Sequence, residues 1–448
     1  MSGSILVLVG ILLTHLLQGS HLSTFDATIY CLQDITIGPS QNYSNEPHYI
    51  PEGSTWNDTV TSIPRQLMEA LSNPVQLGNL FAAYWWGYPL LLIPSGLLSS
   101  RLPSEPLLAL AMLCASVSTL ATPFCLHRSY AWTVFVRLTR GVVGGVLSTL
   151  TLPYVRRSFP QHLGLLTGLT FACNRIGSAL AYPITGALCT HEHWDKSLML
   201  FGSVGLIAAT IFGLGTLGSL RTKTWSPKES QTKGKRTTKG AKETIKELVK
   251  MFSERHLYVL CACRLAQQFY QLPYISFLPK YFRDVLALDL DGDSVFLVLI
   301  FLSGTLSRGM AGLLSDWLRR RLDLGPALKI MHSLACLVPM GAILTLTLLP
   351  PSAPAATTLF SLSFFFLSMA TITLSVAANV HYTNSGSLFY SLVLQVGSIG
   401  SITVPYVVEV LTASSLTSDW NALLLAMTLG CLGTSWSLYI TERFPKRQ

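Results

Sequence analysis

Long apolar runs alternate with short polar segments along the whole chain of 448 residues. A run of about 20 predominantly apolar residues is long enough to cross the hydrocarbon core of a bilayer as an α-helix. Such runs occur at residues 4–29, 75–99, 107–126, 131–155, 163–188, 197–219, 257–283, 294–317, 327–350, 357–380, 387–411 and 420–440. We therefore predict an all-α membrane protein with twelve transmembrane helices in two pseudo-symmetric halves of six.

The predicted helices define the domain organisation. The expected segments are an N-terminal half at 1–219 containing a long loop at 30–73, a basic linker at 220–256, a C-terminal half at 257–440 and a tail at 441–448. The apolar part of the first run, Ile5 to Leu17, has the length of a signal-peptide core. No basic residue precedes it and no small-x-small cleavage site follows it, so we interpret it as the first helix.

One phrase occurs twice, at equivalent places in the two halves. "SGLLSSRLP" begins at Ser95 and "AGLLSDWLRRR" begins at Ala311, at the ends of the second and eighth predicted helices. A glycine lets a neighbouring helix approach closely, and an acidic residue with arginines can pair with another helix end. The alternative is a chance match of small and apolar letters. We predict a cytoplasmic gate made of Gly96, Arg101, Gly312, Asp316, Arg319 and Arg320.

Composition and charge agree with a bilayer environment. Half of the residues are hydrophobic and only 12% are charged, about half the charge of an ordinary soluble domain. Residues 221–256 hold eleven Lys/Arg against four Asp/Glu, a net of +7 out of +9 for the chain. This concentration in one segment argues against a nucleic-acid-binding protein. No nucleotide loop, nucleophile motif or metal-ligand spacing is present, so we predict neither an enzyme nor a cofactor.

The positive charges also predict an orientation. With the N-terminus in the cytoplasm, the basic linker and the arginine clusters fall on the cytoplasmic side. The 30–73 loop then faces the lumen or the cell exterior, and it holds the glycosylation sequons at Asn42 and Asn57. Cys31 and Cys189 would face that side too, so the sequence allows a disulfide between them without specifying it. Both termini are expected in the cytoplasm, in a plasma or vesicle membrane.

The arrangement resembles the major facilitator superfamily, and several motifs resemble its solute carrier family 17 of organic anion, sodium/phosphate and vesicular anion transporters. Helix 2 reads "WWGYPLLLIPSGLLSSRL", helix 4 "RLTRGVVGG" and helix 5 "NRIGSALAYPITG". The chain departs from the vesicular glutamate members at Gly144, Phe81, Gln267 and Leu92, where those members carry an acid, a histidine, an arginine and a glutamine. The resemblance therefore does not extend to glutamate specificity.

Ionisable residues inside the predicted helices are the candidate site. Arg137 lies six residues into its helix, about 9 Å deep at 1.5 Å per residue. Arg140 and Arg175 lie at similar or greater depth, and guanidinium groups suit capture of carboxylate or phosphate. The alternative is that these arginines bond backbone carbonyls and brace the bundle. Arg264 and Arg308 are weaker candidates, because both can snorkel toward the cytoplasm.

Three further residues complete the prediction. His21 and Asp26 form a titratable pair that could carry a coupling proton or cation, although a position in water at the mouth of the bundle is slightly favoured for both. Tyr84 could stack on a substrate, whereas packing is the commoner role of such an aromatic residue.

We predict a secondary transporter that moves a carboxylate- or phosphate-type anion by alternating access, as a monomer, coupled to a proton, sodium or voltage gradient. Its partners are the anion, the coupling ion and membrane lipid, with no nucleic acid. Transport of a neutral solute such as a sugar, or a sensor of this fold that no longer transports, are the alternatives. The sequence does not identify the substrate, the coupling ion or the membrane.

Overall fold

The computed structural model describes residues 2–37, 64–98, 104–158, 163–189, 193–221, 249–288, 290–349, 352–381 and 386–443. These residues are mainly helical, with no β-strand among them. A helix satisfies its own backbone hydrogen bonds, which lipid cannot do, so apolar runs of this length fold as helices in a bilayer.

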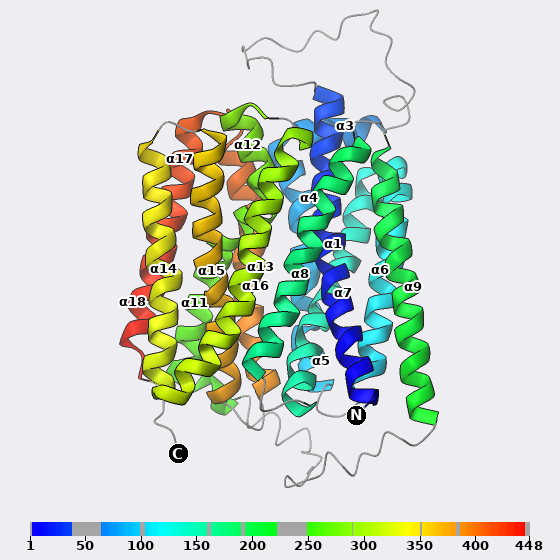
Figure 1. Cartoon of the computed structure of the whole chain (residues 1–448). Helices are drawn as coiled ribbons and strands as arrows, with labels where there is room; N and C mark the ends of the chain where they lie inside the picture. Colours follow the sequence, from blue (N-terminus) through cyan, green and yellow to red (C-terminus); the bar gives the residue numbers. More distant parts are fainter. Residues whose placement is uncertain are drawn as a thin grey trace, which may run out of the picture.

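The helices group into two halves, as Figure 1 shows. The first half contains α1 (Ser2–Ile37), α3 (Arg65–Ser72), α4 (Pro74–Gly87), η1 (Tyr88–Leu91), α5 (Leu92–Leu98), α6 (Ser104–Arg128), α7 (Tyr130–Ser158), α8 (Leu163–Cys189) and α9 (Trp194–Arg221). The second half contains α11 (Arg255–Leu272), η4 (Pro273–Phe277), α12 (Leu278–Leu286), α13 (Leu290–Arg321), α14 (Leu324–Leu348), α15 (Ala353–His381), α16 (Gly386–Leu411), α17 (Thr417–Leu425), η5 (Ala426–Leu432) and α18 (Gly433–Thr441).

The two ends of the bundle are named here after short helices at each of them. The α3 end is uppermost in Figure 1, and the opposite end, where α5 lies and where α1 begins, is the α5 end. Within the described residues, nine helical segments are long and apolar enough to cross a membrane. The other predicted spans correspond to α4 with α5, to α8 and to α11 with α12.

The structure moves some predicted boundaries. The first helix extends to Ile37 instead of ending at residue 29, and α3 lies in a segment predicted as loop. Three predicted helices are also interrupted, the last of them by the π-helical segment η5 between α17 and α18. A 3-10 turn at η1 contains Pro89 and a π-helical turn at η4 begins with Pro273, because proline lacks the N–H that a continuous α-helix requires.

Two helix pairs join the halves: α8 packs along α13, and α4 with α5 packs along α16. Within the first half, α4 and α7 come into backbone contact. A Cβ atom placed on Gly141 of α7 would lie 1.9 Å from the carbonyl oxygen of Tyr84 on α4. Only glycine permits this approach, which brings Tyr84 beside Arg137, one turn before Gly141.

Candidate functional site

The centre of the candidate site is an ion pair between α1 and α7. Arg137 Nη2 lies 3.0 Å from Asp26 Oδ1, and both side chains are buried. The Arg137 guanidinium lies 3.8 Å from the centre of the Phe25 ring and 5.6 Å from that of Tyr84. The two aromatic faces and the carboxylate offset part of the cost of burying this charge.

Asp26 also connects the two halves. Its Oδ2 accepts a hydrogen bond of 2.7 Å from Ser276 Oγ, in the π-helical turn η4 of the second half. Two tyrosines of the first half donate to carbonyl oxygens of the same turn: Tyr30 to Ser276 O and Tyr182 to Ile275 O, each at 2.7 Å. The interruption in the α11–α12 helix is therefore where the first half makes a cluster of hydrogen bonds to the second.

The preferred interpretation of His21 and Asp26, as residues in water at the mouth of the bundle, is wrong. Both are buried, at 4% and 0% exposure. Burial follows from the length of α1, which places further helical turns beyond both residues. His21 Nε2 contacts the carbonyl oxygen of Phe201 on α9 inside the first half, 3.0 Å away, whereas Asp26 contacts Arg137 and the second half. They do not act as a contacting pair.

Arg140 and Arg175 are buried with incomplete hydrogen bonding. Arg140 Nε and Nη1 and Arg175 Nε have no partner among the described residues. The Arg175 guanidinium lies 5.8 Å from the ring centre of Phe364 on α15, so this residue of α8 reaches the second half. These three nitrogen atoms therefore do not bond backbone carbonyls within the described residues.

Arg308 does not snorkel. It is 2% exposed, and its Nη1 donates to the carbonyl oxygen of Phe171 on α8 at 2.8 Å. Arg264 is only partly buried, and its Nη1 donates to Gln267 Oε1 at 2.7 Å. Gln267 in turn donates to Thr371 on α15. Arg264 thus bonds a side chain one helical turn further along α11.

Sequence reasoning missed a second buried ion pair. Lys280 Nζ on α12 lies 2.5 Å from Glu409 Oε2 on α16, and both side chains are buried. The two residues lie inside the predicted spans 257–283 and 387–411. A charged residue inside an apolar run was the available signal.

The gate residues are only partly described. Gly96 is buried on α5, which packs against α16. Gly312 is buried on α13, and a Cβ atom on Gly168 of α8 would lie 3.5 Å from the Gly312 Cα atom. Both glycines therefore belong to helices that meet the other half. Arg320 is exposed. Arg101, the side chains of Asp316 and Arg319, and the sequons at Asn42 and Asn57 lie outside the described residues.

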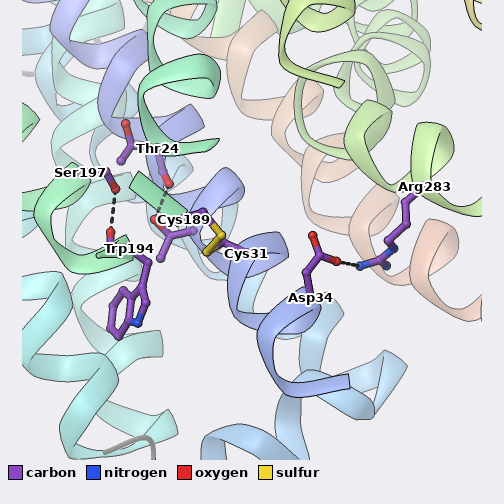
Figure 2. The surroundings of a disulfide bond; sticks show 8 residues. Thr24, Cys31, Asp34, Cys189, Trp194, Ser197 and Arg283 are labelled. Carbon is purple, nitrogen blue, oxygen red and sulfur yellow. Dashed lines mark hydrogen bonds and ion pairs between the residues drawn. A yellow bond between two sulfur atoms is a disulfide. The ribbon is translucent and has the colours of Figure 1, made fainter. Parts of the chain in front are cut away.

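The disulfide that the sequence left open is formed at the α3 end. Cys31 of α1 is bonded to Cys189 of α8, as Figure 2 shows. One turn further along α1, Asp34 Oδ1 lies 3.1 Å from Arg283 Nη1 of α12. One turn of α1 is thus joined covalently to its own half, and the next is joined by an ion pair to the other half. In the described part of the chain, no group of three or more His, Cys, Asp or Glu residues could hold a metal ion.

Comparison with known proteins supplies the family. A family model described as Major Facilitator Superfamily matches residues 53–405. Vesicular glutamate transporter 2.2 of Danio rerio is 22% identical over 376 residues, covering 80% of this chain and 62% of that protein. Vesicular glutamate transporter 2 of Homo sapiens is 21% identical, covering 80% and 63%. The matched part thus spans less than two thirds of these relatives. Probable anion transporter 1, chloroplastic, of Oryza sativa subsp. japonica is 23% identical, covering 60% and 51%.

Solved structures show the same fold. A bacterial homolog of the human lysosomal transporter Spinster, inward-facing and unoccupied, has a TM-score of 0.63 at 13% identity, covering 98% of this chain and 96% of that one. The transporter FucP, in the outward conformation, has a TM-score of 0.64 at 14% identity, covering 98% of both chains. The chain thus matches an inward-facing and an outward-facing structure about equally well.

Proposed function

Because the chain belongs to the Major Facilitator Superfamily, we propose that it is a secondary transporter moving a carboxylate- or phosphate-type anion by alternating access between its two halves. The observation that carries this proposal is the charge inside the bundle. Arg140, Arg175, Arg264 and Arg308 form no ion pair with a carboxylate among the described residues. Buried cations without a counter-ion favour an anionic ligand.

Asp26 is the coupling residue that the contacts support. Its carboxylate connects Arg137 on α7 to Ser276 in the other half. Binding of a proton or a cation at Asp26 would weaken its attraction for Arg137 and free that guanidinium for the transported anion. His21 lacks such a connection, because the contact described for its side chain is with α9 of its own half.

The orientation remains part of the proposal, with the α5 end in the cytoplasm. The Cys31–Cys189 disulfide at the α3 end supports it, because disulfides persist in oxidising compartments such as the lumen or the cell exterior. The domain limits at 219 and 257, the linker at 220–256 and the monomeric state are also retained as proposals. The linker is expected to lie against acidic lipid head groups.

Uptake by proteoliposomes tests the function directly. The purified protein is reconstituted, and uptake of labelled carboxylates and phosphate is measured with imposed pH, sodium and voltage gradients in turn, with a labelled sugar in parallel. We expect gradient-dependent uptake of an anion and none of the sugar. Uptake of the sugar alone would support the neutral-solute alternative, and no uptake of any solute would refute transport.

Arg137→Ala is the first variant to test, and we expect it to abolish anion uptake. Because it leaves Asp26 buried without its partner, at a cost of about 3–5 kcal/mol, size-exclusion chromatography must first show a folded protein. Arg137→Lys keeps the charge but loses the two-pronged donor, so it should retain weak uptake. Wild-type uptake in either folded variant would remove Arg137 from the site.

A further inference from the structure

Arg175 and Arg308 come from opposite halves and lie close together, and Arg264 is within Coulombic range of Arg308. Arg175 is on α8, and Arg264 and Arg308 are on α11 and α13. The hydrogen bond from Arg308 to Phe171 O fixes the Arg308 guanidinium against α8, one helical turn before Arg175. Close backbone contact allows this, because a Cβ atom on Gly168 would lie only 2.4 Å from the Arg308 carbonyl oxygen.

Each of the three arginines retains unused donor capacity. The Nε atoms of Arg175, Arg264 and Arg308 are buried and have no hydrogen-bond partner among the described residues. Neutral groups are the hydrogen-bond acceptors of Arg264 and Arg308: the Gln267 side-chain amide and the Phe171 backbone carbonyl. Arg137 and Lys280, by contrast, each have a carboxylate within 3.0 Å, whereas Arg140 is buried without one among the described residues. The bundle therefore has a charge-balanced part and an unbalanced part.

The positive charge of Arg308 is close to two others. Arg308 is subject to Coulombic repulsion from both Arg175 and Arg264. Burying like charges without a counter-ion is unfavourable. A ligand with one negative charge would neutralise only one of the three positive charges. Two tyrosine hydroxyls lie close enough to interact electrostatically with this group, Tyr390 of α16 with Arg308 and Tyr88 of η1 with Arg264. They add O–H donors from both halves to the N–H donors of the arginines.

We propose that Arg175, Arg264 and Arg308 form a binding site for a small anion with at least two negative charges, such as a dicarboxylate or doubly ionised phosphate. The proposal rests on the proposed function and deepens it, because it assigns charge selection to these three arginines while Arg137 stays paired with Asp26 until that carboxylate binds its proton or cation. A bound dianion would bridge α8 and α13 by accepting hydrogen bonds from both halves. It would thereby replace a repulsion across their interface with an attraction.

Binding is measured first, in detergent and without any gradient, by the shift in the thermal unfolding midpoint. Butyrate and succinate form the matched pair, because both have four carbon atoms and differ in the number of carboxylates. At equal ionic strength and neutral pH, we expect succinate to raise the midpoint and to bind at least about tenfold more tightly than butyrate. Equal stabilisation by the two anions would overturn the proposal.

Variants then assign the effect to the arginines. Arg308→Gln and Arg175→Gln should each weaken succinate binding by about tenfold or more, and should weaken the smaller effect of butyrate by less. Arg65→Gln is the matched control, because Arg65 is exposed on α3 and pairs only with Glu69 among the described residues. If Arg308→Gln does not fold, Arg175→Gln alone makes the comparison, because Arg308→Lys would keep the charge. Wild-type succinate binding in folded Arg175→Gln would refute the site.

Transport separates this proposal from the function on which it rests. Gradient-driven uptake of butyrate equal to that of succinate would refute selection by charge number and leave anion transport standing. Succinate binding that depends on Arg175 and Arg308, without gradient-driven uptake of any anion, would support the site and refute the transport function.

Discussion

At the scale of single residues, Arg137 on α7 takes its counter-ion from a different helix, α1. The motif resemblance implies an acid on the same helix, where this chain has Gly144. Here that space is taken by Tyr84, whose hydroxyl would lie 2.2 Å from a Cβ atom on Gly144. The carboxylate comes from α1 instead, as Asp26. The buried charge is retained while its counter-ion is supplied by a different helix.

Asp26→Asn tests the coupling role. The amide oxygen can still accept from Ser276 or Arg137, but the side chain no longer carries a charge that a proton can remove. We expect anion exchange to persist while uptake loses its response to an imposed pH gradient. Ser276→Ala is the matched control, since it removes the hydrogen bond of 2.7 Å and keeps the carboxylate. An unchanged pH-gradient response in Asp26→Asn would exclude Asp26 from coupling.

At the scale of helices, close approach at glycine sets the interface between the halves. Gly168 of α8 lies against the backbone of Arg308 and beside Gly312 of the repeated phrase. The second copy of the repeated phrase thus lies on the surface of α13 that the backbone of α8 approaches closely. A side chain at such a point would force the helices apart, because the obstructing atoms are backbone atoms.

Gly168→Val should separate α8 from α13 and strongly reduce the rate of transport. Its Cβ atom would lie 2.4 Å from the Arg308 carbonyl oxygen. Gly309→Ala on α13 is the control, because nothing lies within 4 Å of its added Cβ atom. That change should leave transport unaltered and raise stability by about 0.5–1 kcal/mol through helix propensity. Initial uptake rates and unfolding midpoints are measured for both variants. Equal uptake rates in the two variants would contradict a role for close contact at Gly168.

At the scale of the whole molecule, the halves contact each other at both ends of the described structure. Asp34 with Arg283 joins them at the α3 end, and α5 packs on α16 at the α5 end. Alternating access requires these contacts to break in turn. The disulfide keeps α1 attached to α8, so the α3 end of the first half should move as one body.

The orientation predicts glycosylation at the α3 end. Expressed in a eukaryotic cell, the protein should lose apparent mass on treatment with an N-glycosidase. Asn42→Gln with Asn57→Gln should abolish that shift, because both sequons lie in the segment between α1 and α3.

Treatment of sealed, right-side-out vesicles with an external protease should leave the tail after residue 441 intact. Cleavage of that tail in sealed vesicles would reverse the orientation.

The sequence by itself determined the fold class, because long apolar runs have few ways to satisfy their backbone in lipid. It also identified Arg137, Arg140 and Arg175 as buried charges, since an arginine inside such a run stands out. Only the tertiary structure decided their partners. The pairs Asp26–Arg137 and Lys280–Glu409 join residues more than 100 positions apart. The pattern of apolar and polar residues along one helix does not show which helix, distant in the sequence, will pack against it, or by which face. For the same reason, Arg308 was expected to snorkel, whereas the approach of α8 and α13 buries it between the two halves.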